Sequence, residues 1–138
     1  MNKASLVRAA WAAGDLRYKL HSGQRKIWET ISSARSKLFV INCARQFGKS
    51  FLAVAWCCAK AASTPRFRIK YCSAFRDDLK EYIIAHFETI LEDCPGHMRP
   101  KWVASQNKYV FPNGSEIKII GLDKNPDGLR GNTIDLIM

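Results

Sequence analysis

No apolar run among these 138 residues is long enough to cross a membrane, because the longest, Phe51–Ala59, falls far short of the ~20 residues that a spanning helix needs. The first 15 residues contain no long apolar segment, so we expect a short amphipathic helix there and no secretory signal. The chain also has no internal repeat, no low-complexity tract and no linker long enough to divide it. These absences argue against membrane-spanning, secreted and repeat proteins, and they favour one globular domain.

The five cysteines form no paired framework. They stand at positions 43, 57, 58, 72 and 94, and no two of them have the C-x-x-C spacing. Small secreted domains that depend on disulfides usually carry an even number of cysteines. An odd number, without a secretory signal, indicates a reducing, intracellular setting.

Acidic residues are scarce in the first half of the chain. Up to Arg76 only Asp15 and Glu29 accompany 15 lysines and arginines, whereas the remainder has ten acids and seven bases. The net charge of the whole chain is +10. A basic half is consistent with a polyanionic partner and equally with a solvated basic surface, so charge alone leaves both interpretations open.

Apolar residues make up 47% of the chain and aromatic residues 11%, which is enough for a packed core. Their periodicity predicts alternating helices and strands. The expected elements are a helix over 23–35, a strand over 37–42, a helix over 49–62, a strand over 67–74, a helix over 76–93, a hairpin over 108–120 and a strand over 133–138. This order predicts an α/β fold with a largely parallel sheet.

Individual residues support several of these predicted elements. Ser22 can N-cap the helix over 23–35. The helix over 49–62 is apolar nearly all round, which is typical of a helix buried on most sides. Asn113 and Gly114 are the residues that a tight primed hairpin turn favours. The helix over 76–93 places five apolar residues on one face: Leu79, Ile83, Phe87, Ile90 and Leu91.

The stretch NCARQFGKS, residues 42–50, ends like a phosphate-binding loop, whose usual pattern is G-x-x-x-x-G-K-[ST]. A predicted strand precedes it and a predicted helix follows it, as that motif requires. Cys43 replaces the first glycine, which eases the turn out of the strand, and cysteine is small enough if its φ is negative. The alternative is a simple turn that places a lysine at the start of a buried helix.

In a working phosphate loop, backbone N–H groups point at phosphate oxygens. Gly48 would permit close approach of the backbone, Lys49 would reach the β- and γ-phosphates, and Ser50 would bind Mg²⁺ through its hydroxyl. The residues expected around the phosphates of the nucleotide are Cys43, Ala44, Arg45, Gln46, Phe47, Gly48, Lys49 and Ser50.

Arg45 places a long cation inside a crowded loop, and such a guanidinium needs an anion. One interpretation is an arginine finger supplied in cis, which contacts the γ-phosphate as negative charge spreads in the transition state. The other is a salt bridge to an acid elsewhere in the domain.

Three motifs in order, LHSGQ, ARQFGKS and GLRGNTIDLIM, together resemble the ATPase domain of the large terminase subunits of phages, over about residues 16–138. The hairpin around Asn113 and Gly114 fits the same family. The resemblance implies a P-loop NTPase fold of the RecA-like, ASCE type, with flanking helices and a β-hairpin. It also implies the ATP-binding portion of a DNA-packaging motor, which couples ATP hydrolysis to translocation of double-stranded DNA into the procapsid.

The resemblance assigns roles to single residues. Gln24 would read the adenine edge, although without the family it would be interpreted as a helix-surface glutamine. Arg45 would act as a catalytic or coupling finger, on its own nucleotide or on a neighbour's, and Lys49 and Ser50 would bind the phosphates and Mg²⁺. Three residues would lead into the Walker B strand and couple hydrolysis to motion, or form only a glycine-containing turn: Arg130, Gly131 and Asn132.

In the family an Asp-Glu pair follows the apolar strand, but here IDLIM ends the chain where those acids should begin. Asp135 is not a substitute, because it lies within the strand and should not reach its ligand-binding end. We therefore expect residues 1–138 to be the N-terminal part of an ATPase domain, without its remaining strands or the nuclease domain. Such a chain should bind ATP but hydrolyse it poorly, and its uncovered strand edge invites self-association.

The resemblance further implies a small terminase subunit, a portal ring and a homo-oligomeric ring as partners, in the cytoplasm of an infected bacterial host and away from membranes. Other functions remain open at this point. They are a helicase-like DNA-dependent ATPase, a small-molecule kinase, and a basic nucleic-acid-binding module without enzymatic activity.

Overall fold

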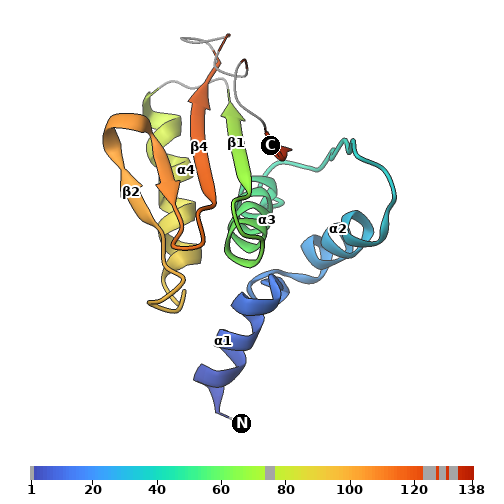
Figure 1. Ribbon diagram of the computed structural model, residues 1–138. Coiled ribbons are helices and arrows are strands. Elements are labelled where there is room, and N and C mark those ends of the chain that lie inside the picture. The colour runs from blue at the N-terminus through green and yellow to red at the C-terminus, as the bar shows by residue number, and fades with distance from the viewer. Residues whose placement is uncertain (1, 74–76, 123–126, 128–129, 131–133) are drawn as a thin grey trace.

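The computed structural model describes residues 2–73, 77–122, 127, 130 and 134–138, and it describes the side chains of the fourth helix from Glu81 onward. Within this part the chain forms an α/β fold with four α-helices and a mixed five-stranded sheet (Figure 1). The α-helices are α1 (Lys3–Ala13), α2 (Ser22–Ser33), α3 (Lys49–Ser63) and α4 (Asp77–Leu91), and two short 3₁₀ turns are η1 (Arg17–Lys19) and η2 (Ala104–Gln106). The strands are β1 (Arg68–Ser73), β2 (Lys101–Val103), β3 (Lys108–Val110), β4 (Glu116–Gly121) and β5 (Leu136–Ile137).

The sheet has the strand order β2-β3-β4-β1-β5. β1 lies between β4 and β5 and is parallel to both, whereas β2, β3 and β4 form an antiparallel meander. The prediction of a largely parallel sheet is therefore only half right. The sequence pattern missed β2, because three residues are too few to display an alternation of apolar and polar side chains.

One face of the sheet is covered by α3 and α4. The buried side chains of Ile69 and Tyr71 on β1 and of Ile117 on β4 point to this face. Phe87 of α4 packs its ring against Tyr71 and against Tyr109 of β3, with ring centroids 6.2 and 4.9 Å apart. Full burial of each such apolar side chain contributes about 1.5–3 kcal/mol, so these contacts fix both helices on the sheet.

The helices largely follow the predicted pattern. α3 is buried on most sides, and α4 buries Ile83, Phe87, Ile90 and Leu91 as expected, whereas the side chain of Leu79 lies outside the described residues. α2 packs on α3 through Trp28, whose ring centroid is 4.7 Å from that of Trp56. No helix within the described residues is long and apolar enough to span a membrane.

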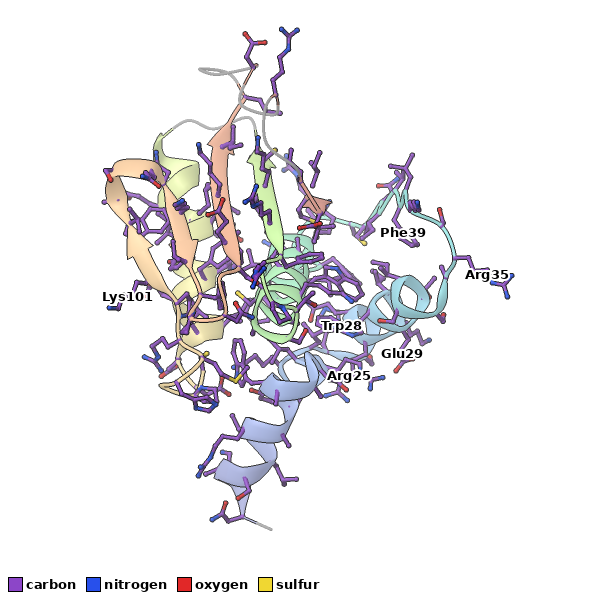
Figure 2. All side chains as sticks on the ribbon, in the orientation of Figure 1. Arg25, Trp28, Glu29, Arg35, Phe39 and Lys101 are labelled. Carbon is purple, nitrogen blue, oxygen red and sulfur yellow. The ribbon has the colours of Figure 1, made fainter. Side chains whose placement is uncertain are left out.

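The predicted buried strand over 37–42 is wrong. This segment connects α2 to α3 as an extended chain without strand pairing, and Leu38 and Val40 are 81% and 89% exposed. Figure 2 labels Phe39 within it, away from the sheet. The reason is that an apolar β-branched run becomes a strand only where another strand offers hydrogen bonds, and in the described residues β5 ends the sheet on this side without pairing to it.

The predicted hairpin is confirmed, but its turn differs from the prediction. β3 and β4 are joined by a three-residue turn in which Phe111 N–H donates to the carbonyl of Ser115 at 2.8 Å, and Gly114 N–H donates to that of Phe111 at 3.0 Å. Within this turn only Gly114 has a positive φ, +86°. A primed two-residue turn needs either a positive φ at both of its central residues or a glycine at the first of them. The longer turn carries Pro112 at a position where its fixed φ fits.

Asp93, just after α4, ties α1 and η1 to the rest of the fold. It accepts hydrogen bonds from Trp11 Nε1 at 3.1 Å and from the Tyr18 hydroxyl at 2.7 Å, and it pairs with Lys19 Nζ at 2.7 Å. Burial alone would raise the pKa of Asp93, but the bonds from Lys19, Tyr18 and Trp11 outweigh burial and lower it. The folded state is therefore stabilised by the ionised carboxylate, and this contribution is lost as the pH falls through the lowered pKa.

We expect Asp93→Asn to destabilise the protein by about 1–2 kcal/mol at neutral pH, because it removes the charge that Lys19 and Tyr18 contact. Urea unfolding at pH 7 and at about pH 3, below the ordinary pKa of aspartate, measures this cost. The difference between parent and variant should shrink at the lower pH. Asp127→Asn is the matched control, since its exposed pair with Arg130 contributes little. Equal costs for both variants would contradict the prediction.

Candidate functional site

The segment Cys43–Gly48 forms a compact loop directly before α3. Phe47 N–H donates to the carbonyl of Ala44 at 3.3 Å, which closes a turn centred on Arg45 and Gln46. Two residues adopt left-handed backbone conformations, Gln46 with φ +60° and Gly48 with φ +89°. The loop therefore bends sharply enough to enter the helix at Lys49, which is the helix that the phosphate-loop motif requires. The strand that the same motif requires before the loop is not formed.

The amino end of α3 is open to an anion. Gly48 is its N-cap, and no side chain caps the first-turn N–H groups. Those N–H groups have no partner inside a helix, and together with the helix dipole they favour negative charge. The first turn contains no acidic residue that could supply this charge from within the helix.

Two cations flank this helix end. Lys49 is exposed, and its Nζ donates to the carbonyl of Cys43 at 3.0 Å, so it folds back over the start of the loop. Arg45 is exposed, and within the part of the chain that the structure describes it has no hydrogen bond and no ion pair. No acid among these residues therefore forms the salt bridge considered for Arg45.

Ser50 lies in the first turn of α3 and is half-buried. Burial raises the pKa of Tyr71 on β1, and a hydrogen bond with Ser50 acts in the opposite direction, which places the serine hydroxyl beside that tyrosine. A hydroxyl is a suitable ligand for Mg²⁺, which takes only one or two protein ligands when it arrives with a nucleotide. The described residues contain no group of three or more His, Cys, Asp or Glu that could hold a metal ion by themselves.

Gln24 of α2 is buried against the loop, with only 3% of its surface exposed, so the interpretation as a helix-surface glutamine is wrong. Its Nε2 donates to the carbonyl of Gly48 at 2.9 Å, and its Oε1 accepts from His21 N–H at 3.0 Å. Both ends of the amide that was expected to read adenine are thus bonded to the main chain.

His21 is the residue that the sequence analysis missed. It, and not Ser22, is the N-cap of α2: its Nδ1 accepts from the N–H groups of Gly23 and Gln24 at 3.2 and 3.3 Å. Since Nδ1 accepts, the proton of the neutral ring lies on Nε2, which donates to the carbonyl of Phe47 at 2.8 Å. The spacing His21-x-x-Gln24 matches a capping box, and this signal could have identified the N-cap.

α2 therefore holds the loop by its main chain. Nε2 of His21 and Nε2 of Gln24 contact the carbonyls of two consecutive loop residues, Phe47 and Gly48. The rings of His21 and Phe47 also meet edge to face, with centroids 4.9 Å apart. Such contacts fix the shape of the loop whatever its side chains do, and leave Arg45 and Lys49 exposed.

The remaining predicted residues bond to other parts of the fold or lie outside the described part of the chain. Arg130 is exposed, and its Nε pairs with Asp127 at 3.3 Å, whereas Gly131 and Asn132 lie outside the described residues. Asp135 Oδ2 accepts from the N–H of Arg68 at 2.9 Å, at the amino end of β1. β5 begins only at Leu136, so the prediction that Asp135 lies within the strand is wrong. Its bond to Arg68 nevertheless places the carboxylate at the amino end of β1, opposite to the ligand end of the sheet.

Comparison with known proteins gives one clear result. The sequence matches the model of a family described as "Terminase large subunit, T4likevirus-type, N-terminal" over residues 40–138, which include the loop, α3 and every strand of the sheet. No curated protein matches the chain. A match to this family indicates a component of a DNA-packaging motor. Because the match covers most of the sequence, the chain belongs to the family of T4-like terminase large subunits, in their N-terminal region.

Proposed function

We propose that Cys43–Ser50 binds the phosphates of ATP in a DNA-packaging motor. The observation that carries this proposal is the open amino end of α3, where uncapped N–H groups lie beside the exposed cations Arg45 and Lys49. A helix N-terminus with two nearby cations attracts a multiply charged anion more strongly than it attracts a singly charged one.

Each residue has a proposed role. The ammonium of Lys49 exchanges the carbonyl of Cys43 for β- and γ-phosphate oxygens, which replaces a neutral acceptor by a negatively charged one. Arg45 contacts the γ-phosphate, of this chain or of a neighbouring subunit, and Ser50 binds the Mg²⁺ that accompanies the nucleotide. Gln24 holds Gly48 in place, and an adenine base that it reads takes over one of its present bonds.

The energy of hydrolysis is proposed to drive translocation of double-stranded DNA, with Arg130, Gly131 and Asn132 in the coupling and with a portal ring, a small terminase subunit and further copies of the chain as partners. The chain itself is expected to hydrolyse ATP slowly. Among the described residues no acid forms a hydrogen bond or an ion pair with the loop, and Asp135 is bonded to β1. An attacking water that no carboxylate orients reacts slowly.

Fluorescent ATP titrated with Mg²⁺ into the parent and into Lys49→Ala tests the proposal. We expect saturable binding by the parent and at least a tenfold loss in the variant, or about 1.4 kcal/mol, because the lysine supplies a charge-assisted contact. Lys26→Ala, at an exposed lysine of α2, is the matched control and should bind like the parent. A folded parent that binds no nucleotide, or equal affinities for all three proteins, would refute the proposal.

A further inference from the structure

Two consecutive carbonyls of the loop, those of Phe47 and Gly48, face α2. They accept hydrogen bonds from His21 Nε2 at 2.8 Å and from Gln24 Nε2 at 2.9 Å. The peptide bonds here are trans, and in a trans peptide the carbonyl and the following N–H point to opposite sides. The N–H groups of Gly48 and Lys49 are therefore turned away from α2, and within the described residues neither has a hydrogen-bond partner. Adjacent free N–H groups of this kind form a concave site for an anion.

His21 is an unusual residue for a helix N-cap. Serine, threonine, aspartate and asparagine are preferred there, because a short side chain suffices to accept from the first N–H groups. Only Nδ1 of His21 serves α2 in this way. Its Nε2, on the other side of the ring, contacts a carbonyl 26 residues further along the chain. Capping alone therefore does not account for an imidazole at this position, whereas the bond to the loop does.

The ring of Phe47 also fits against the first turn of α2. Its centroid lies 4.9 Å from that of His21, edge to face. A Cβ built on Gly23 would lie 3.0 Å from Cε2 and Cζ of Phe47, so the ring occupies the space that a side chain would need there. Glycine inside a helix costs stability relative to alanine, so Gly23 serves the contact with Phe47 and not α2 itself. Both the carbonyl and the ring of Phe47 are thus held by α2.

We propose that His21 is a positioning residue of the phosphate loop, which acts through the Phe47 carbonyl to turn the N–H of Gly48 toward the phosphates. The proposal rests on the proposed binding of ATP phosphates by Cys43–Ser50, and it adds a residue outside that motif which sets the affinity. A donor that is already oriented raises affinity, because less of the loop has to be ordered when the ligand binds. Since these N–H groups face phosphates and not a base, the effect is the same for ATP and for inorganic tripolyphosphate.

His21→Ser separates this role from helix capping. Serine is a favoured N-cap and keeps the capping box with Gln24, but its short side chain leaves the Phe47 carbonyl without this donor. His21→Ala removes the cap as well, so its melting temperature should fall further than that of His21→Ser.

Titration calorimetry with Mg²⁺ and either ATP or tripolyphosphate measures the effect on binding. We expect both variants to bind both ligands about fivefold or more weakly than the parent, the factor that one lost hydrogen bond typically gives. If His21 only capped α2, His21→Ser would bind like the parent, and that result would overturn the proposal. A loss confined to ATP would overturn it as well, because it would assign His21 to the base.

Trypsin cleavage after Arg45 tests the same bonds without any ligand. Arg45 is exposed in the middle of the loop, and Arg35, labelled in Figure 2, is exposed in the connection before it. At low extents of digestion, His21→Ser should be cut after Arg45 about fivefold or more faster than the parent, because a loop that is no longer held opens more often. Cleavage after Arg35 is the control and should not change.

Equal rates of cleavage after Arg45 in His21→Ser and the parent would overturn the proposal. The two readouts also keep the two proposals distinct. A parent that binds neither ligand refutes the phosphate site, and faster cleavage after Arg45 in His21→Ser would still show that His21 holds the loop.

Discussion

Gly48→Ala should weaken nucleotide binding at least tenfold and destabilise the protein by about 2–3 kcal/mol. Two causes act at this position. Its φ of +89° lies in the left-handed region, which costs a residue with a side chain about 1–2 kcal/mol. A Cβ built on Gly48 also lies 2.5 Å from Gln24 Nε2, so Gln24 must move and its bond to the Gly48 carbonyl is lost, at about 1 kcal/mol.

A double-variant cycle separates the two causes. In a Gln24→Ala background the clash is absent, so Gly48→Ala should there cost only the backbone strain of about 1–2 kcal/mol. Urea unfolding followed by tryptophan fluorescence gives the free energies, since Trp28 and Trp56 lie at the contact of α2 with α3. Gly96→Ala is the control, because a Cβ there meets nothing within 4 Å. If the costs of Gly48→Ala and Gln24→Ala were strictly additive, the bond from Gln24 would not stabilise the loop.

The sequence predicted well those helices and strands whose own residues carry the whole apolar pattern. α3 and α4 each carry enough apolar residues at helical spacing to define a buried face, and β1 begins with an alternation of polar and apolar side chains from Arg68 to Tyr71. The segment 37–42 is more apolar than β1 and nevertheless failed as a strand. Its state depends on whether a partner strand exists, and that information is not local to the segment.

The candidate site divides in the same way. The loop Cys43–Ser50 was predicted because backbone chemistry requires glycine, lysine and serine at fixed spacing. The hydrogen bonds from α2 to this loop were not predicted. They join side chains to loop carbonyls that are 24 and 26 residues away, and every residue has a carbonyl. A sequence pattern can identify the donor Gln24, but it cannot identify an acceptor that every residue shares.

Asn113→Ala should destabilise the protein by about 2–3 kcal/mol without changing the intrinsic affinity for nucleotide. Asn113 Nδ2 donates to the carbonyls of Ala61 and Ala62 at 2.8 and 3.2 Å, and its Oδ1 accepts from Ser115 N–H at 3.0 Å. The hairpin turn thereby caps the carboxyl end of α3, where a helix leaves carbonyls unsatisfied. Truncation removes these bonds and leaves part-buried carbonyls without a donor.

The isosteric variant Asn113→Asp tests the donor directly. It keeps the acceptor for Ser115 but replaces the amide donor by a carboxylate that faces carbonyl oxygens and the negative end of the α3 dipole. We expect it to be at least as destabilising as Asn113→Ala at pH 7 in urea unfolding. Asn2→Ala is the control, because Asn2 caps only the exposed start of α1 and should cost about 1 kcal/mol or less. A neutral Asn113→Asp would mean that α3 needs no donor at this end, and that the turn is held by Ser115, whose hydroxyl donates to Thr64 at 2.6 Å.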